Sequence, residues 1–82
     1  MEVSEKAYDE IVDLFARGSS TRQILGFRPS EETQGRARYL LDRSRSAQLS
    51  EQEAAELDRF GQLEHMMQLV KARARSYVDA TQ

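Results

Sequence analysis

The sequence predicts an all-α fold, a small helical bundle of three to four helices with one long helix at the carboxyl end. Apolar side chains between residues 50 and 78 recur at alternating steps of three and four, the spacing of one helix face. Residues typical of helix starts and stops divide the rest of the chain, and no alternating run long enough for a strand occurs. We therefore expect one helical domain over residues 1–82, with helices at about 4–17, 20–26, 30–44 and 50–78.

The first predicted helix has an apolar face and an anionic face. Ser4 is its expected N-cap, and Gly18 is expected to end it as a left-handed C-cap residue. The outer face carries four carboxylates: Glu5, Asp9, Glu10 and Asp13.

The second and third helices are predicted from their starts. Ser20 with Gln23 three residues later forms a capping box for a short helix that ends near Gly26. Ser30 follows Pro29 and is the expected N-cap of the third helix. The outer positions of the third helix beyond its first turn are cationic, because only Asp42 is set against four arginines, Arg36, Arg38, Arg43 and Arg45.

The long helix begins at a second capping box, made by Ser50 and Glu53. Gly61 is its one weak helix former. We expect this glycine to be a tolerated surface residue, although a break there would divide the helix in two. One seam of the helix is apolar and consists of Phe60, Leu63, Met67, Val70, Ala74 and Tyr77.

The length of this helix suggests an association. A helix of about 28 residues spans roughly 42 Å, whereas a compact chain of this size has a diameter near about 30 Å. One end should therefore overhang the body, and its apolar seam has to be covered by the amino-terminal helices, by a second copy in a homodimer, or by another protein.

Composition narrows the functional classes. The chain has no cysteine, which excludes a disulfide framework and a thiolate metal site and favours a reducing cytoplasm. The sequence shows neither a membrane span nor a secretion signal, so we expect a soluble cytoplasmic protein with no membrane partner. The net charge of −2 argues against strong non-specific binding of nucleic acid by the whole chain.

Candidate chemistry is sparse. The single histidine, His65, is expected on the outer side of the long helix without further metal ligands. The acidic residues at the start of that helix are explained by its dipole: Glu51, Glu53, Glu56 and Asp58. We predict no catalytic residue, no cofactor and no metal, and hence a protein that is not an enzyme.

Three segments of the chain resemble a known group of proteins. They are 23–32 (QILGFRPSEE), 49–58 (LSEQEAAELD) and 63–74 (LEHMMQLVKARA). Together they look like a family of short, largely uncharacterised bacterial proteins, abundant in cyanobacteria, that resemble antitoxins and are often encoded beside HNH or PIN-type nuclease genes. The resemblance implies a binding and neutralising role without a catalytic residue. Gly61 departs from the family pattern, which usually has a larger residue there.

Two functional hypotheses follow. In the first, the protein is an antitoxin-like interaction module whose long helix binds a cognate toxin or nuclease. The predicted partner-binding residues are Phe60, Leu63, Met66, Met67, Val70, Arg73, Ala74 and Tyr77. In the second, it is a small DNA-binding regulator whose basic third helix contacts phosphates through Arg36, Arg38, Arg43 and Arg45.

Overall fold

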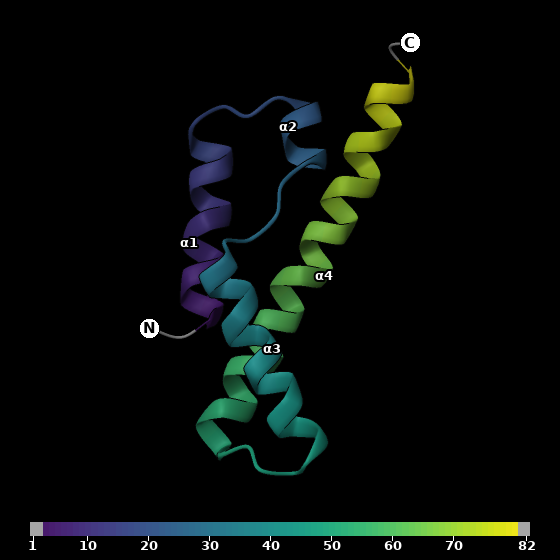
Figure 1. The fold of residues 1–82 in the computed structure, drawn as a ribbon. Coiled ribbons are helices and arrows are strands. Elements are labelled where there is room, and N and C mark those ends of the chain that lie inside the picture. The colour runs from purple at the N-terminus through teal and green to yellow at the C-terminus, as the bar shows by residue number, and fades with distance from the viewer. Residues whose placement is uncertain (1–2, 81–82) are drawn as a thin grey trace.

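The computed structural model describes residues 3–80 and contains four helices within that range (Figure 1). They are α1 (Val3–Ala16), α2 (Thr21–Leu25), α3 (Glu31–Arg45) and α4 (Glu51–Ala80). The predicted all-α fold with a long carboxy-terminal helix is confirmed, and no strand occurs between residues 3 and 80.

Helix α4 is the spine on which the other helices pack. In Figure 1, α3 runs antiparallel to the first part of α4, α1 runs in the same direction as α4, and α2 lies beside its upper part. The molecule measures 48 × 22 × 17 Å, and a 30-residue helix is about 45 Å long. The body is less compact than expected, because it is itself drawn out along α4, and the carboxy-terminal end of α4 extends past α1 and α2 (Figure 1).

The predicted helix starts are confirmed at α2, α3 and α4. At α2, the Gln23 N–H donates to Ser20 Oγ at 3.1 Å and the Ser20 N–H donates to Gln23 Oε1 at 2.8 Å. At α4, the same reciprocal pair joins Ser50 and Glu53, at 3.1 and 3.0 Å. Ser30 Oγ accepts from the backbone of α3 at 3.2 Å.

Helix α1 differs at its start and agrees at its end. It begins at Val3, so Ser4 lies inside the helix and is not its N-cap; the side chain of Ser4 lies outside the described part of the chain. Gly18 has φ +74°, the left-handed conformation predicted for it.

Helix α4 is continuous through Gly61. A Cβ atom added at Gly61 would meet nothing within 4 Å, so the residue faces open space, as its interpretation as a tolerated surface residue requires. The helix extends to Ala80, two residues past the predicted end at 78. The remainder of the expected frayed end, residues 81–82, lies outside the described residues.

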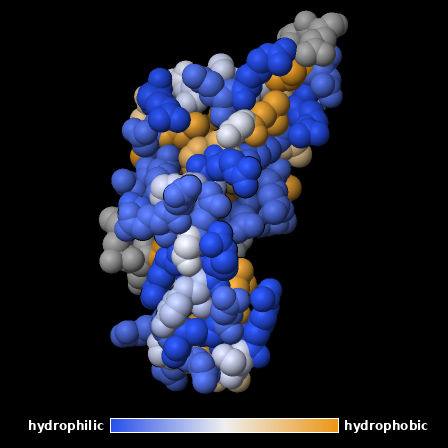
Figure 2. Space-filling view, in the orientation of Figure 1, coloured by the Kyte–Doolittle hydropathy of each residue, from blue (hydrophilic) through white to orange (hydrophobic). Residues whose placement is uncertain are grey.

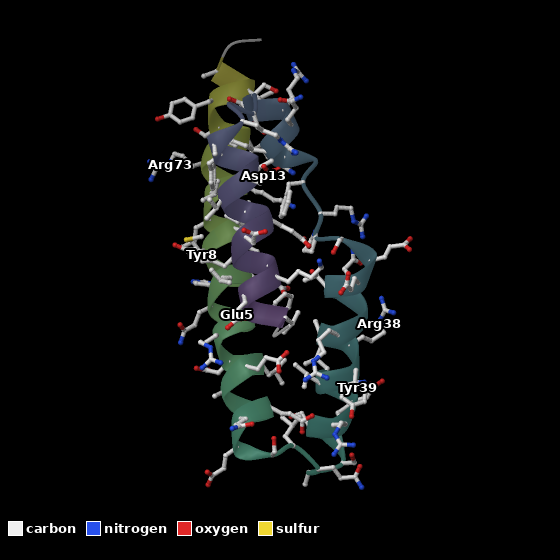
Figure 3. The ribbon with its side chains drawn as sticks, turned by 90° about the vertical axis from the view of Figure 1, so that its left-hand side faces the viewer. Glu5, Tyr8, Asp13, Arg38, Tyr39 and Arg73 are labelled. Carbon is white, nitrogen blue, oxygen red and sulfur yellow. The ribbon has the colours of Figure 1, made fainter. Side chains whose placement is uncertain are left out.

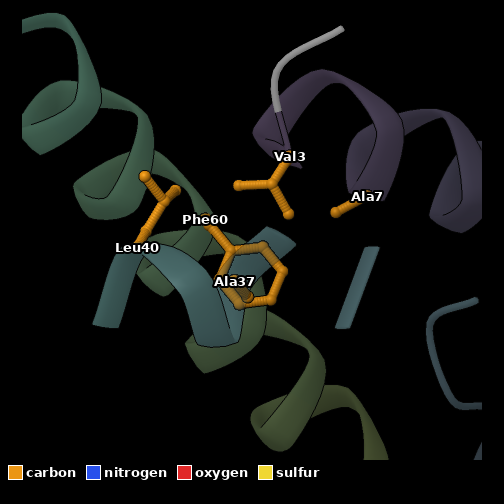
Figure 4. Close-up of a cluster of buried hydrophobic side chains, with 5 residues drawn as sticks. All are labelled: Val3, Ala7, Ala37, Leu40 and Phe60. Atoms are coloured by element: carbon orange, nitrogen blue, oxygen red, sulfur yellow. The ribbon is translucent and has the colours of Figure 1, made fainter. Parts of the chain in front are cut away.

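Two hydrophobic clusters hold the helices together. The first joins α1, α3 and α4, and Figure 4 shows the Phe60 ring beside Ala37, with Leu40 on one side and Val3 and Ala7 on the other. The second joins α1 to the middle of α4 through Ile11, Leu14 and Met67.

The carboxylate of Glu56 connects three helices. Glu56 is only 4% exposed. Its Oε2 accepts from the Val3 N–H at 2.8 Å, at the start of α1, and both its oxygens accept from the Arg36 guanidinium of α3 at 3.0 Å. The hydrogen bond from Arg36 lowers the pKa of Glu56 against the opposing effect of burial, and the Val3 N–H lowers it further. The helix dipole, by which the sequence analysis explained Glu56, is therefore not the whole explanation, because its carboxylate also binds α1 and α3.

Glu10 makes a similar connection from α1 to the start of α3. Its carboxylate accepts from the Ser30 N–H at 2.9 Å, from Ser30 Oγ at 2.7 Å and from Thr33 Oγ1 at 2.9 Å. Burial acts to raise the pKa of Glu10, but these hydrogen bonds together lower it. Of the four carboxylates predicted on the outer face of this helix, Glu10 is therefore one that contacts α3.

The end of α3 contains a left-handed alanine. Ala47 has φ 55°, the Gln48 N–H donates to Arg43 O at 2.9 Å, and the Ala47 N–H donates to Ser44 O at 3.1 Å. These two bonds form a Schellman motif, whose left-handed position usually holds glycine.

We predict that Ala47→Gly stabilises the protein by about 0.5–1 kcal/mol, because glycine adopts positive φ without the clash of a Cβ atom. Gly18→Ala is the matched control with the opposite sign, since a Cβ there meets no neighbour and only the backbone conformation is strained. Urea unfolding followed by circular dichroism measures both. A loss of stability in Ala47→Gly would contradict the assignment.

We predict that Glu56→Gln lowers the free energy of unfolding by about 2 kcal/mol near neutral pH, below the roughly 3–5 kcal/mol of a fully buried pair because the Arg36 side chain is 39% exposed. A folded-state pKa below the ordinary 4.5 gives stability that is present above pH 4.5 and is lost as the pH falls through the folded-state pKa. The difference between wild type and Glu56→Gln should shrink accordingly.

Unfolding measured between about pH 3 and pH 7 tests this, with Glu64→Gln as a control on the exposed side of the same helix. A difference that stays constant across this pH range would show that Glu56 does not act as a charged partner.

Candidate partner-binding groove

A groove of about 730 Å³ opens between α3, α4 and the connection that precedes α3. Figure 2 views the molecule from the side of Figure 1 and shows apolar side chains between the upper part of α4 and α2, bordered by hydrophilic ones. The volume is within the usual range of about 300–1,000 Å³ for ligand sites. This cavity is the candidate functional site, and we call it the α3–α4 groove.

The floor of the groove is apolar. Helix α4 contributes Phe60, Leu63 and Met67, and α1 and α3 contribute Ile11 and Ala37. Three of the eight predicted partner-binding residues therefore meet here. Phe60 is 9% and Met67 5% exposed, so a bound partner would touch them only at the bottom of the groove.

The rim carries exposed polar and apolar side chains. Arg38 and Leu41 line it from α3, and Glu64 and Gln68 line it from α4. Leu41 is 46% exposed and is the largest apolar side chain on the α3 rim. Arg28, also exposed, lines the groove from the connection.

The connection is tied to both neighbouring helices. Lys71 Nζ of α4 donates to the Phe27 carbonyl at 2.7 Å, and Gln34 Nε2 of α3 donates to the Pro29 carbonyl at 2.6 Å. Phe27 packs against the second hydrophobic cluster. These contacts hold the upper wall of the groove in place.

The other predicted partner-binding residues lie elsewhere. Ala74 is 7% exposed, and Val70 packs against the second cluster, so the body of the chain already covers much of the seam. Met66, Arg73 and Tyr77 are exposed and lie outside the groove. The seam predicted as one partner surface is thus divided between the core, the groove floor and a separate exposed side.

The four arginines of α3 do not act together. Arg36 is paired with Glu56, whose hydrogen bond raises the pKa of Arg36. Arg43 lies 3.8 Å from a Glu53 carboxylate oxygen and donates to the Gln48 carbonyl at 2.8 Å. Both guanidinium groups lie over the ring of Tyr39, at 5.3 and 5.5 Å.

The remaining two arginines are exposed. Arg38 lies on the groove rim, and Arg45 pairs at 3.4 Å with Asp42 at the end of α3. Figure 3 shows Arg38 and Tyr39 on the outer side of α3. The cationic face available to nucleic acid is therefore smaller than predicted, because Arg36 and Arg43 form contacts within the bundle.

His65, the single histidine, is exposed on α4. Among residues 3–80, no group of three or more histidine, cysteine, aspartate or glutamate side chains is placed to hold a metal ion. None of the helices in that range is both long and apolar enough to cross a membrane.

Several groove residues were not predicted as site residues. Leu25, Arg28, Gln34 and Leu41 come from three different elements, and no local pattern connects them. Phe27 packs against the second hydrophobic cluster and also lines the groove. An aromatic residue beside a glycine in a short segment indicates packing, but it does not reveal that a groove lies next to it.

Comparisons with models of protein families, with curated proteins and with solved structures found no match to this chain.

Proposed function

We propose that this protein is a non-enzymatic interaction module, antitoxin-like in role, that binds and neutralises a cognate toxin or nuclease through its long helix α4. The observation that carries the proposal is the α3–α4 groove, whose floor brings together Phe60, Leu63 and Met67. A protein that offers a preformed apolar groove along a helix can accept an apolar segment of a partner.

The charges around the groove favour one kind of partner segment. Arg28 and Arg38 are exposed on its rim, and the Lys71 ammonium lies at its upper wall, against the single carboxylate of Glu64. An excess of positive charge beside an apolar floor favours a segment with large apolar side chains flanked by aspartate or glutamate. The occupant we propose is such a segment of the cognate protein.

The ionisable groups support binding over catalysis. Those with shifted pKa values are Glu10, Arg36, Glu53 and Glu56, and all of them serve helix starts or ion pairs between helices. None of these four lines the groove. Perturbed pKa values in a cleft are a common sign of a catalytic site, whereas here they lie in the supporting structure.

The antitoxin-like role rests on the resemblance of segments 23–32, 49–58 and 63–74 to antitoxin-like bacterial proteins. Two of these segments contribute to the groove, through Phe27 and Pro29 in the first and through Leu63, Glu64 and Met67 in the third. The segments that carry the resemblance and the residues that carry the geometry thus overlap.

We predict that the protein binds the product of the adjacent gene at micromolar or lower concentration, and that Arg38→Glu weakens this binding about tenfold, which corresponds to roughly 1.4 kcal/mol. The matched control is Arg45→Glu, the same change on the same helix outside the groove, for which we expect little effect. Isothermal titration calorimetry measures both variants.

Absence of binding at micromolar concentration would remove the antitoxin role. Equal weakening by Arg38→Glu and Arg45→Glu, together with binding of promoter DNA that falls steeply with salt, would favour the DNA-binding alternative instead.

A further inference from the structure

A second apolar surface lies on the side of the molecule away from α3. It consists of exposed side chains from α1 and α4, which we call the α1–α4 face: Tyr8, Val12, Phe15, Met66, Leu69 and Tyr77. Their exposed fractions are between 41% and 61%. Figure 3 shows Tyr8 on one edge of the molecule and Arg38 and Tyr39 on the opposite edge, so this face is separate from the α3–α4 groove.

The face is continuous across the two helices. Tyr8, Val12 and Phe15 follow each other at steps of four and three, which places them along one line of α1. Helix α1 runs parallel to α4, with Val3 beside Glu56 and Ile11 beside Met67. The apolar line of α1 therefore lies alongside the stretch of α4 that contains Met66 and Leu69, and Tyr77 lies beyond the end of α1.

The face extends over more apolar surface than isolated exposed residues would. Large exposed patches on small proteins usually mark an interaction site. Helix α1 is about 21 Å long, and two packed helices are roughly 20 Å wide, so the flat area is about 400 Å². Two such faces would bury about 800 Å² in total, below the roughly 1,200 Å² of the smallest standard interfaces, so this face fits a weak association with a dissociation constant in the micromolar range or above.

The charges at the two ends of the face are opposite. Glu5 lies at the lower end on α1, and Arg73 lies toward the upper end on α4, one turn before Tyr77, and both are on the same side of the molecule as Tyr8 (Figure 3). A twofold axis that crosses the middle of the face exchanges its ends. It would bring Glu5 of one copy toward Arg73 of the other, twice per dimer.

We propose that two copies of this chain associate through the α1–α4 face, with Tyr8, Phe15 and Leu69 at the centre and with Glu5 and Arg73 paired toward the ends. The face is complementary to itself in both apolar surface and charge, as an interface between identical copies requires. Because the α3–α4 groove lies on the other side, each copy in the dimer keeps its groove open.

Sedimentation equilibrium of the full chain between about 5 and 500 µM tests this proposal. We expect the mass to rise from 9.4 kDa toward twice that value with a micromolar dissociation constant. Leu69→Glu should raise the dissociation constant at least tenfold. Leu41→Glu is the matched control, because Leu41 is a similarly exposed leucine on the groove side.

A charge exchange tests the pairing of the ends. Glu5→Arg and Arg73→Glu should each weaken the dimer, and the double variant should recover most of the lost affinity, with circular dichroism confirming that every variant is folded. A monomer at all concentrations, a dimer unaffected by Leu69→Glu, or a double variant no stronger than either single one would each overturn the proposal.

The test is independent of the proposed function. Leu69→Glu should still bind the cognate protein, and Arg38→Glu should still form the dimer, so a failure of one proposal is distinguishable from a failure of the other.

Discussion

The arrangement of this bundle depends on the buried carboxylate of Glu56. A carboxylate removed from water is costly unless its oxygens are hydrogen-bonded to a cation or to N–H groups. Here the carboxylate has both kinds of partner, a cation in the Arg36 guanidinium of α3 and an N–H group in Val3 at the start of α1. The position of one side chain on α4 thereby fixes where α1 begins and how α3 lies against the spine.

Glu10 extends the same principle to the next helix. Its carboxylate accepts from the Ser30 N–H and from the hydroxyls of Ser30 and Thr33 at the start of α3, where the helix dipole also favours negative charge. The two carboxylates therefore connect α1, α3 and α4 to one another. Glu56 joins α4 to α1 and α3, and Glu10 joins α1 to the start of α3. The α3–α4 groove and the α1–α4 face are among the surfaces that this arrangement leaves uncovered.

The sequence predicted the helices well because their signals are local. Ser20 with Gln23 and Ser50 with Glu53 are separated by three residues, and each pair defines a helix start whatever the rest of the fold does. Glu56 and Glu10 could not be assigned in this way. Their partners are 53 and 20 residues distant, and a carboxylate in the first turns of a helix has an adequate local explanation.

The surface of α4 was harder to predict than its length. The periodic seam correctly indicated an apolar side, but periodicity does not distinguish residues covered by the same chain from residues offered to a partner. Phe60, Met67 and Ala74 are buried by the chain itself, whereas Tyr77, on the same predicted seam, is 61% exposed. The difference depends on where α1, α2 and α3 lie along α4, which no local pattern contains.

The titration of the Glu56 carboxyl carbon by nuclear magnetic resonance, together with the amide of Val3, tests the central claim most directly. If the carboxylate holds the start of α1 against α4, the carboxyl midpoint lies below 4.5 and the Val3 amide shifts with the same midpoint. A midpoint at or above 4.5, with a Val3 amide that does not respond, would contradict the account.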